Sequence, residues 1–173
     1  MRLLVMACLL STAALLPRAL AQTPPAPAAK PCATAEYRQF DFWLGDWNVK
    51  NAAGKDVGTN HLVSLHGGCA MQESWASPSG VTGSRLSGWD SSRKQWHQTW
   101  MDNGGNVLQL DGALADGKMV LAGDTNDPRT GSTTRNRVTW IPLADGRVRQ
   151  WWEQSADGGK TWTTAFDGYY SRQ

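Results

Sequence analysis

Two glutamates stand among aromatic residues that could alter their acid–base chemistry. The mature chain has three glutamates, and two of them lie in Met71-Gln-Glu-Ser-Trp75 and Arg149-Gln-Trp-Trp-Glu153. Burial among aromatic rings raises the pKa of a carboxyl group, so that Glu73 or Glu153 could act as a general base. Arg149 could then stabilise an anion. The pattern predicts either an ion pair that plugs the interior or a site that orients a ligand.

The sequence from Ser155 to Trp162 decides which side chains share a face with Glu153. Ser155-Ala-Asp-Gly-Gly-Lys-Thr-Trp162 fits the Asp-box of sialidases, a hairpin turn that those propellers repeat and that occurs once here. The box is therefore interpreted as a turn and not as a glycosidase site. If it pairs Ser155 with Trp162, one strand face carries polar and aromatic groups together: Arg149, Trp151, Glu153, Trp162, Phe166 and Tyr170.

A mostly aromatic face is expected to form the interior of the fold. An arginine and a glutamate on such a face must be paired or hydrogen-bonded, because an isolated buried charge is very unfavourable. We therefore predict that six residues contribute to an interior ligand pocket: Glu73, Trp75, Arg149, Trp151, Glu153 and Tyr170.

A second hairpin between Arg85 and Met101 carries a similar mixture of side chains. It is expected to pair Trp89 with Trp96, which places Gln98 and Trp100 on the face of Arg85 and turns His97 away. Which face looks inward stays open, because a β-bulge would invert it.

Motifs for metal, hydrolase or nucleotide chemistry are missing from the sequence. His61 and His66 differ by an odd number and so point to opposite sides of a strand, and His97 has no acidic or histidine neighbour on its own face. We therefore expect no metal site. Gly-x-Ser-x-Gly, His-Glu-x-x-His and a phosphate-binding glycine loop do not occur, which disfavours ordinary hydrolases and nucleotide-binding proteins.

The elements that must position these groups are short strands. From Trp47 onward, β-type runs alternate with Gly, Asp, Asn and Ser turns at intervals of about 8 to 12 residues. Such short connections allow only antiparallel neighbours, so the all-β chain is expected to close into a single up-and-down barrel of about ten strands; a β-sandwich is the alternative. A helical turn or two is expected within 36–44. The predicted strands are 46–51, 57–65, 69–76, 82–90, 94–102, 106–114, 117–124, 133–142, 147–155 and 161–171.

The N-terminal residues divide into a targeting segment and an arm. Arg2, an apolar run that ends at Leu16 and the sequence Ala19-Leu-Ala21 predict a signal peptide over 1–21. The run is about fourteen residues, short of the roughly 20 that span a membrane, so no membrane insertion is expected after cleavage. Residues 22–35 are rich in Pro and Ala and predict a flexible arm, and 36–173 form the barrel domain.

Export and charge limit the partners of the mature chain. Of the 17 lysines and arginines, Arg2 and Arg18 leave with the signal, so that basic residues balance the 15 acidic ones. This neutrality disfavours nucleic acid and anionic membranes as partners and leaves a small-molecule ligand. The expected location is periplasmic or secreted.

Cys32 and Cys69 remain after signal cleavage. In an exported protein they are expected to form a disulfide that ties the arm to the barrel; the alternative is two free buried thiols.

The segment Phe40-Asp-Phe-Trp-Leu-Gly-Asp-Trp47 resembles the opening of calycin-like barrels, in which the Gly-x-Trp tryptophan plugs one end. The chain is most similar to an exported bacterial calycin/lipocalin-like family of unassigned function, and distantly to nitrobindin-type barrels. Further matches lie in Trp96-His-Gln98, Thr139-Trp-Ile-Pro-Leu143, Arg147-Val-Arg-Gln150 and Phe166-Asp-Gly-Tyr169. The resemblance implies a fold and not an activity.

The resemblance to nitrobindin-type barrels does not imply a haem cofactor. Those proteins bind haem through a histidine on a late strand, whereas this chain has no histidine after His97. We therefore expect no cofactor.

Three classes of function remain open. The first is an exported barrel that binds a small, partly apolar ligand in its interior. The second is an enzyme on the same barrel, with Glu73 or Glu153 as general base and Arg149 as anion stabiliser. The third is a carbohydrate-binding or envelope-interaction module with exposed tryptophans. A cavity would favour the first two classes, and a planar row of exposed tryptophans the third.

Overall fold

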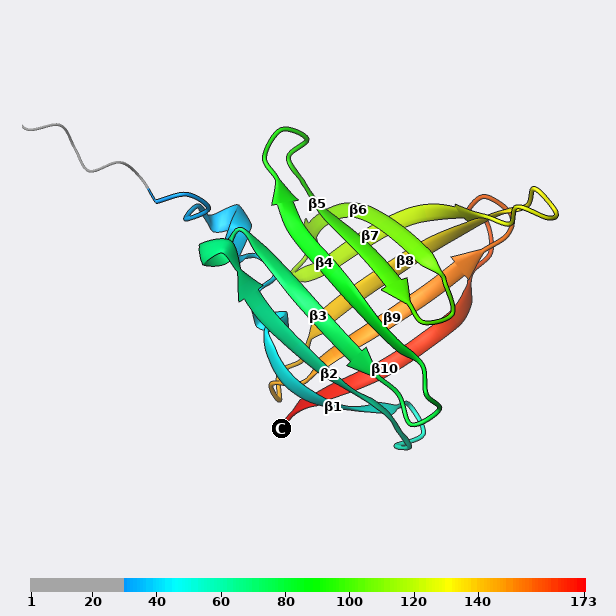
Figure 1. Cartoon of the computed structure of the whole chain (residues 1–173), viewed down its shortest axis with the longest axis horizontal. Helices are drawn as coiled ribbons and strands as arrows, with labels where there is room; N and C mark the ends of the chain where they lie inside the picture. The colour runs from blue at the N-terminus through cyan, green and yellow to red at the C-terminus, as the bar shows by residue number, and fades with distance from the viewer. Residues whose placement is uncertain (1–29) are drawn as a thin grey trace, which may run out of the picture.

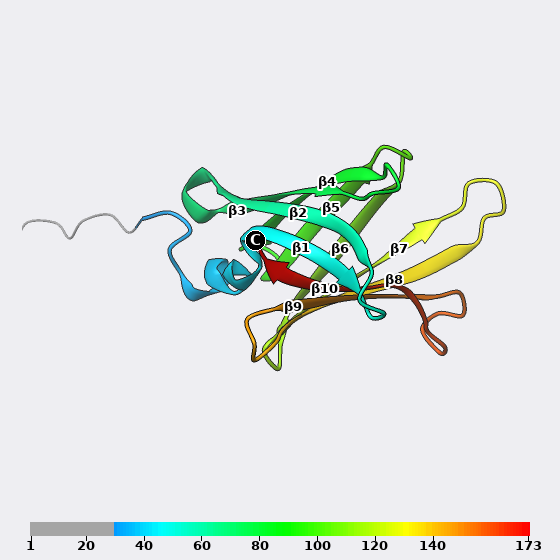
Figure 2. The same ribbon diagram turned by 90° about the horizontal axis from the view of Figure 1, so that it is seen from below.

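Ten antiparallel strands form a closed barrel in the computed structural model, which describes residues 30–173 (Figures 1 and 2). The predicted signal peptide 1–21 and most of the arm 22–35 lie outside the described residues. Three short 3-10 helices, η1 (Ala35–Arg38), η2 (Asp41–Trp43) and η3 (His66–Gly68), accompany the strands. The strands are β1 (Gly45–Asn51), β2 (Asp56–Leu65), β3 (Ala70–Ala76), β4 (Thr82–Asp90), β5 (Gln95–Asp102), β6 (Val107–Ala115), β7 (Lys118–Asn126), β8 (Thr133–Pro142), β9 (Val148–Ser155) and β10 (Thr163–Arg172).

The first and last strands close the sheet. β1 pairs with β10 from Trp47 opposite Arg172 to Asn51 opposite Gly168, and every other pair joins strands that follow one another in the chain. The predicted single up-and-down barrel is therefore confirmed, and the sandwich is not formed. Observed and predicted strands differ by at most two residues at an end, as at 161–171 against Thr163–Arg172.

The connections have the turn chemistry that the sequence predicts. The β6–β7 hairpin turns through Asp116 and Gly117, whose φ angles are 48° and 74°. Positive φ at both central residues is typical of the type I′ turn that matches the twist of paired strands.

Aromatic side chains plug one end of the barrel. Trp43 and Trp47 stack with ring centroids 5.8 Å apart, and Trp47 Nε1 donates to the Trp43 carbonyl at 3.0 Å. Phe40 packs edge-on against Trp140 at 5.1 Å, and Tyr170 against Trp43 at 4.5 Å. All five side chains are buried, so the N-terminal 3-10 turns close this end.

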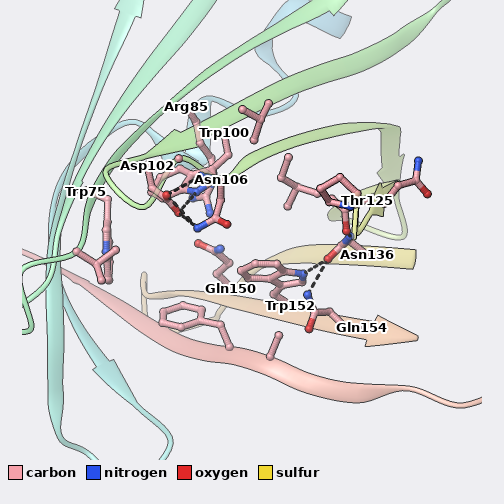
Figure 3. A pocket seen from close by; sticks show the side chains of 18 of the residues that line it. Trp75, Arg85, Trp100, Asp102, Asn106, Thr125, Asn136, Gln150, Trp152 and Gln154 are labelled. Carbon is pink, nitrogen blue, oxygen red and sulfur yellow. Dashed lines mark hydrogen bonds between the residues drawn. The ribbon is translucent and has the colours of Figure 1, made fainter. Parts of the chain in front are cut away.

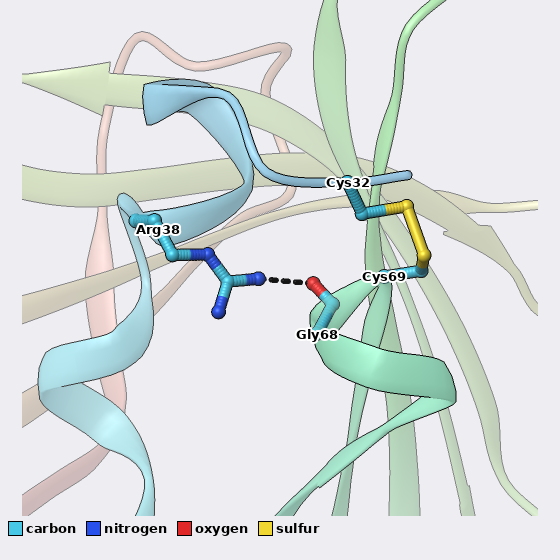
Figure 4. Close-up of a disulfide and its surroundings, with 4 residues drawn as sticks. All are labelled: Cys32, Arg38, Gly68 and Cys69. Atoms are coloured by element: carbon cyan, nitrogen blue, oxygen red, sulfur yellow. Dashed lines mark hydrogen bonds between the residues drawn. A yellow bond between two sulfur atoms is a disulfide. The ribbon is translucent and has the colours of Figure 1, made fainter. Parts of the chain in front are cut away.

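The predicted disulfide is present at the same end (Figure 4). Cys32 and Cys69, 37 residues apart in the chain, are bonded with their Cα atoms 5.0 Å apart. The guanidinium of Arg38 also donates to the Gly68 carbonyl. Both links tie the segment before β1 to the η3 turn that precedes β3.

Within the described residues, no helix has the length and apolar character needed to cross a bilayer.

Replacing both Cys32 and Cys69 with Ser should lower the free energy of unfolding by about 4 kcal/mol, because the unfolded chain loses a 37-residue loop constraint. Urea titration followed by tryptophan fluorescence measures this change, and reduced wild type should match the variant. Coincident unfolding curves for variant and oxidised wild type would contradict the expectation.

Candidate functional site

A cavity of about 630 Å³ lies inside the barrel, and Figure 3 shows the side chains that line it. Residues from the β3–β4, β5–β6 and β7–β8 connections, Val81, Gly105 and Pro128, lie around its mouth. Five aromatic side chains line it: Trp75, Trp100, Trp152, Phe166 and Tyr170. Tyr170 also contacts Trp43, so the plug forms part of the cavity floor.

Inward-facing glycines make room for three of these rings. A Cβ on Gly58 would overlap the ring of Trp75, and one on Gly83 would overlap the ring of Trp100. Gly168 has the same relation to Phe166, whose ring atom Cε1 would lie 2.5 Å from an added Cβ. The missing side chains let the rings lie against the barrel wall.

An ion pair lies at the inner end of the cavity. Arg85 Nη1 donates to Glu73 Oε1 at 2.5 Å, and the two side chains are 10% and 2% exposed. The Arg85 guanidinium lies over the Trp100 ring, 4.5 Å from its centroid. Arg85 lines the cavity, whereas Glu73 lies behind it, with its Oε2 buried and without a partner among residues 30–173. The Asn60 amide, oriented to satisfy its neighbours, donates to Glu73 Oε1 at 3.3 Å.

Tyr170 remains a neutral hydrogen-bond donor. Burial raises its pKa well above the usual phenol value, and the negative charge of Glu73 raises it further, against a smaller opposing effect of Arg85. Its hydroxyl donates to Gln150 Oε1 at 2.8 Å.

Asn136 organises the opposite wall (Figure 3). Its Oδ1 accepts hydrogen bonds from Trp152 Nε1 at 3.0 Å and Gln154 Nε2 at 3.1 Å. Its Nδ2 donates to Thr125 Oγ1 at 3.2 Å. Because the Asn136 side chain is fully buried, these bonds fix the Trp152 ring in one orientation.

A carboxylate lies at the mouth. Asp102 accepts hydrogen bonds from Trp100 Nε1 at 3.2 Å and Asn106 Nδ2 at 3.0 Å. Burial raises the pKa of Asp102, but hydrogen bonds from Asn106, Trp100 and the Gly104 amide outweigh it and lower the pKa overall. Asp102 is therefore anionic near neutral pH.

The six residues predicted to line a pocket are divided between the two faces of the sheet. Trp75 and Tyr170 line the cavity, and Glu73 points inward behind Arg85. On β9 the inward side chains that line the cavity are Gln150, Trp152 and Gln154. Arg149, Trp151 and Glu153 alternate with them and lie on the outer face, which corrects the predicted face.

A β-bulge explains the difference. Thr163 and Thr164 pair with Gln154 and Glu153, as the Asp-box turn predicts, but the register then shifts at Ala165 and places Phe166 opposite Trp152. Phe166 and Tyr170 therefore share the inner face with Trp152 instead of Trp151.

Arg149 and Glu153 also have other partners than each other. Arg149 makes two hydrogen bonds to Asp167, at 2.7 and 2.9 Å. Glu153 accepts two from Arg137, at 3.0 and 2.9 Å. Both outer pairs join neighbouring strands, so they contribute to the sheet and not to the cavity.

The sequence contains a signal for Arg85 but none that identifies Asn136. Trp89 pairs with Trp96, and Arg85 shares a face with Trp100, as the hairpin predicts. In the closed barrel, the strand face that carries Arg85 and Trp100 points inward. Asn136 acts through Trp152 and Gln154 on the next strand, and this relation depends on the register of β8 with β9.

Two histidines, His61 and His97, have an aspartate partner on the neighbouring strand. His97 Nδ1 lies 2.8 Å from Asp111 Oδ1 on β6, which corrects the expectation that His97 has no acidic neighbour on its face. In residues 30–173, no three His, Cys, Asp or Glu side chains are grouped in a way that could hold a metal ion.

The Asp-box forms a hairpin turn. Asp157 Oδ1 accepts from the Lys160 and Thr161 amides at 2.9 Å, and Trp162 Nε1 donates to the Gly159 carbonyl at 3.0 Å. The Trp162 ring is covered by Arg137, whose Cζ lies 4.0 Å from the ring centroid.

Comparison of the chain with known protein families and with curated proteins finds no match.

Replacing Asn136 with Ala should lower the free energy of unfolding by about 3 kcal/mol, because two donors on β9 lose a buried acceptor. Asn126→Ala, at an exposed position on β7, is the control and should change stability by less than about 0.5 kcal/mol. Thermal or urea unfolding compares them, and equal effects of the two substitutions would contradict the role of Asn136.

Proposed function

We propose that the protein binds a small, partly apolar molecule inside its barrel. The observation that carries this proposal is the 630 Å³ cavity with five aromatic side chains in its lining. Ligand sites in proteins are typically concave, mostly apolar and supplied with a few placed polar groups. A ten-stranded barrel is wide enough to leave such a space, whereas an eight-stranded core is nearly filled by side chains.

The lining is organised before a ligand arrives. Trp152 is held by Asn136, Trp100 by Asp102 and Tyr170 by Gln150. Groups that are fixed in advance lose little conformational freedom on binding, which favours affinity.

The Cys32–Cys69 disulfide fits an oxidising compartment. Together with the signal-like N-terminus, it supports a periplasmic or secreted location for the binding protein.

The enzyme alternative gains no support from the site. Arg149 and Glu153 lie on the outer face and pair with Asp167 and Arg137. Glu73 is inside, but Arg85 holds one of its oxygens and the carboxylate is not part of the cavity lining. A general base must reach its substrate, and these carboxylates do not reach into the cavity.

The carbohydrate-binding alternative needs exposed aromatic faces. Of the tryptophans, all within the described part of the chain, none is fully exposed. The two on the outer face of β9 and its hairpin, Trp151 and Trp162, each have an arginine guanidinium over the ring, at 4.9 and 4.0 Å. Arginine thus occupies a face that a sugar would use.

Adjacent tryptophans on β9 provide a matched test of the interior site. We expect the apolar fluorescent probe N-phenyl-1-naphthylamine to bind saturably, and Trp152→Leu to weaken binding roughly tenfold through loss of aromatic contact. Trp151→Leu, which removes the neighbouring ring from the outer face, should change affinity by less than about twofold. Fluorescence titration measures all three proteins. Non-saturable binding, or a larger loss in Trp151→Leu, would contradict the proposed function.

A further inference from the structure

We propose that the cavity selects an uncharged, planar aromatic molecule bearing a hydrogen-bond acceptor such as a carbonyl oxygen, which binds to Arg85. This inference rests on the proposed function and specifies its ligand class.

The guanidinium of Arg85 makes fewer hydrogen bonds to the described residues than it has N–H donors. A guanidinium carries five N–H donors, and within residues 30–173 the Arg85 group makes one hydrogen bond, from Nη1 to Glu73. The side chain is 10% exposed and lines the cavity. Nε and Nη2 of Arg85 are not among the buried atoms without a partner, so these donors are open to the cavity, and an acceptor at its inner end is the complementary ligand group.

The position of these donors is fixed. The guanidinium lies between the carboxylate of Glu73 and the ring of Trp100, with the Trp140 centroid 5.9 Å away. Stacking and the ion pair hold the donor plane at a constant depth in the barrel. A ligand acceptor must therefore enter with its ring in the aromatic part and its acceptor innermost.

The charges around the cavity favour a neutral ligand. Glu73 neutralises Arg85, and the titratable groups that line the cavity besides Arg85 are Tyr170, which is neutral, and Asp102, which is anionic. A carboxylate would be repelled by Asp102 and would find the charge of Arg85 already compensated. An ammonium group at the inner end would face the donors of Arg85. An uncharged acceptor avoids both the repulsion by Asp102 and the contact of a cation with the donors of Arg85.

The aromatic lining favours a flat ring system. Trp75 and Phe166 meet edge to face at 6.0 Å, and Trp152 is fixed on the wall by Asn136. A planar aromatic ligand can contact these rings by stacked or edge-to-face packing.

Three probes with one ring system test the selectivity: naphthalene-2-carboxamide, 2-naphthoate and 2-naphthylmethylammonium. Isothermal titration calorimetry at pH 7 should find the carboxamide at least about tenfold tighter than either charged probe, because its oxygen accepts from Arg85 without repulsion by Asp102, whereas the ammonium offers Arg85 no acceptor. Tightest binding of the carboxylate would overturn the inference in favour of an anion site at Arg85. Tightest binding of the ammonium would overturn it in favour of Asp102 as the anchor.

The same measurements separate ligand binding in the cavity from selectivity for an uncharged acceptor. Saturable binding of N-phenyl-1-naphthylamine without preference among the three probes would overturn the selectivity and leave the proposed function standing. Failure of all four molecules to bind would overturn both.

Glu73→Gln isolates the role of charge compensation. It keeps the side-chain shape and releases the charge of Arg85, so 2-naphthoate should bind about tenfold tighter while the carboxamide changes by less than about threefold. Glu153→Gln, which alters the glutamate paired with Arg137 on the outer face, is the matched control and should change no affinity. An unchanged ranking in Glu73→Gln would contradict the inference.

A second variant covers the case in which Glu73→Gln does not fold, because it leaves a buried guanidinium without its counter-charge. The double substitution Glu73→Gln and Arg85→Gln removes both charges together. Circular dichroism checks its fold, and its carboxamide affinity should fall about tenfold while N-phenyl-1-naphthylamine affinity is kept. Retained carboxamide affinity would show that Arg85 does not bind the acceptor.

Discussion

The pairing of β1 with β10 closes the sheet, and the inside of this protein is defined by that closure. In a closed barrel each strand divides its residues strictly between interior and exterior, so a shift of one residue exchanges the two sets. The bulge at Ala165 makes such a shift within β10. It brings Phe166 and Tyr170 to the face of Trp152, and the contents of the cavity depend on it.

The two ends of the closed barrel also differ: one is plugged by aromatic side chains, and the other contains the cavity. At one end, the residues before β1 supply the rings of Phe40 and Trp43, and the disulfide holds this segment in place. At the other end, inward glycines beside Trp75, Trp100 and Phe166 leave space unfilled. Between the two ends, Asn136 bonds Trp152 and Gln154, whereas Arg85 makes one hydrogen bond within residues 30–173 and lines the cavity with its guanidinium. This arrangement underlies the proposed selection of a ligand by its shape and one acceptor more than by its net charge.

The sequence predicts the strands, the barrel and the disulfide because turns and alternation are local signals. Of the six predicted pocket residues, Trp75 and Tyr170 line the cavity, whereas Glu73 points inward but lies behind Arg85 and does not line it. The sequence misplaces Arg149, Trp151 and Glu153, because no local signal marks the bulge that moves Phe166 past Trp151. It also does not identify the partners of Arg85 and His97, because Glu73 and Asp111 lie on neighbouring strands and are brought close only by register.

Binding of a ligand inside the barrel can be tested directly with the ten tryptophans. The ¹H–¹⁵N spectrum of the indole Nε1–H groups, assigned by single substitutions, would be recorded during titration with naphthalene-2-carboxamide. If the ligand binds inside the barrel, the signals of Trp75, Trp100 and Trp152 will shift with saturation, while those of Trp151 and Trp162 will not move. Shifts confined to Trp151 and Trp162 would place the ligand on the outer face and contradict an interior site.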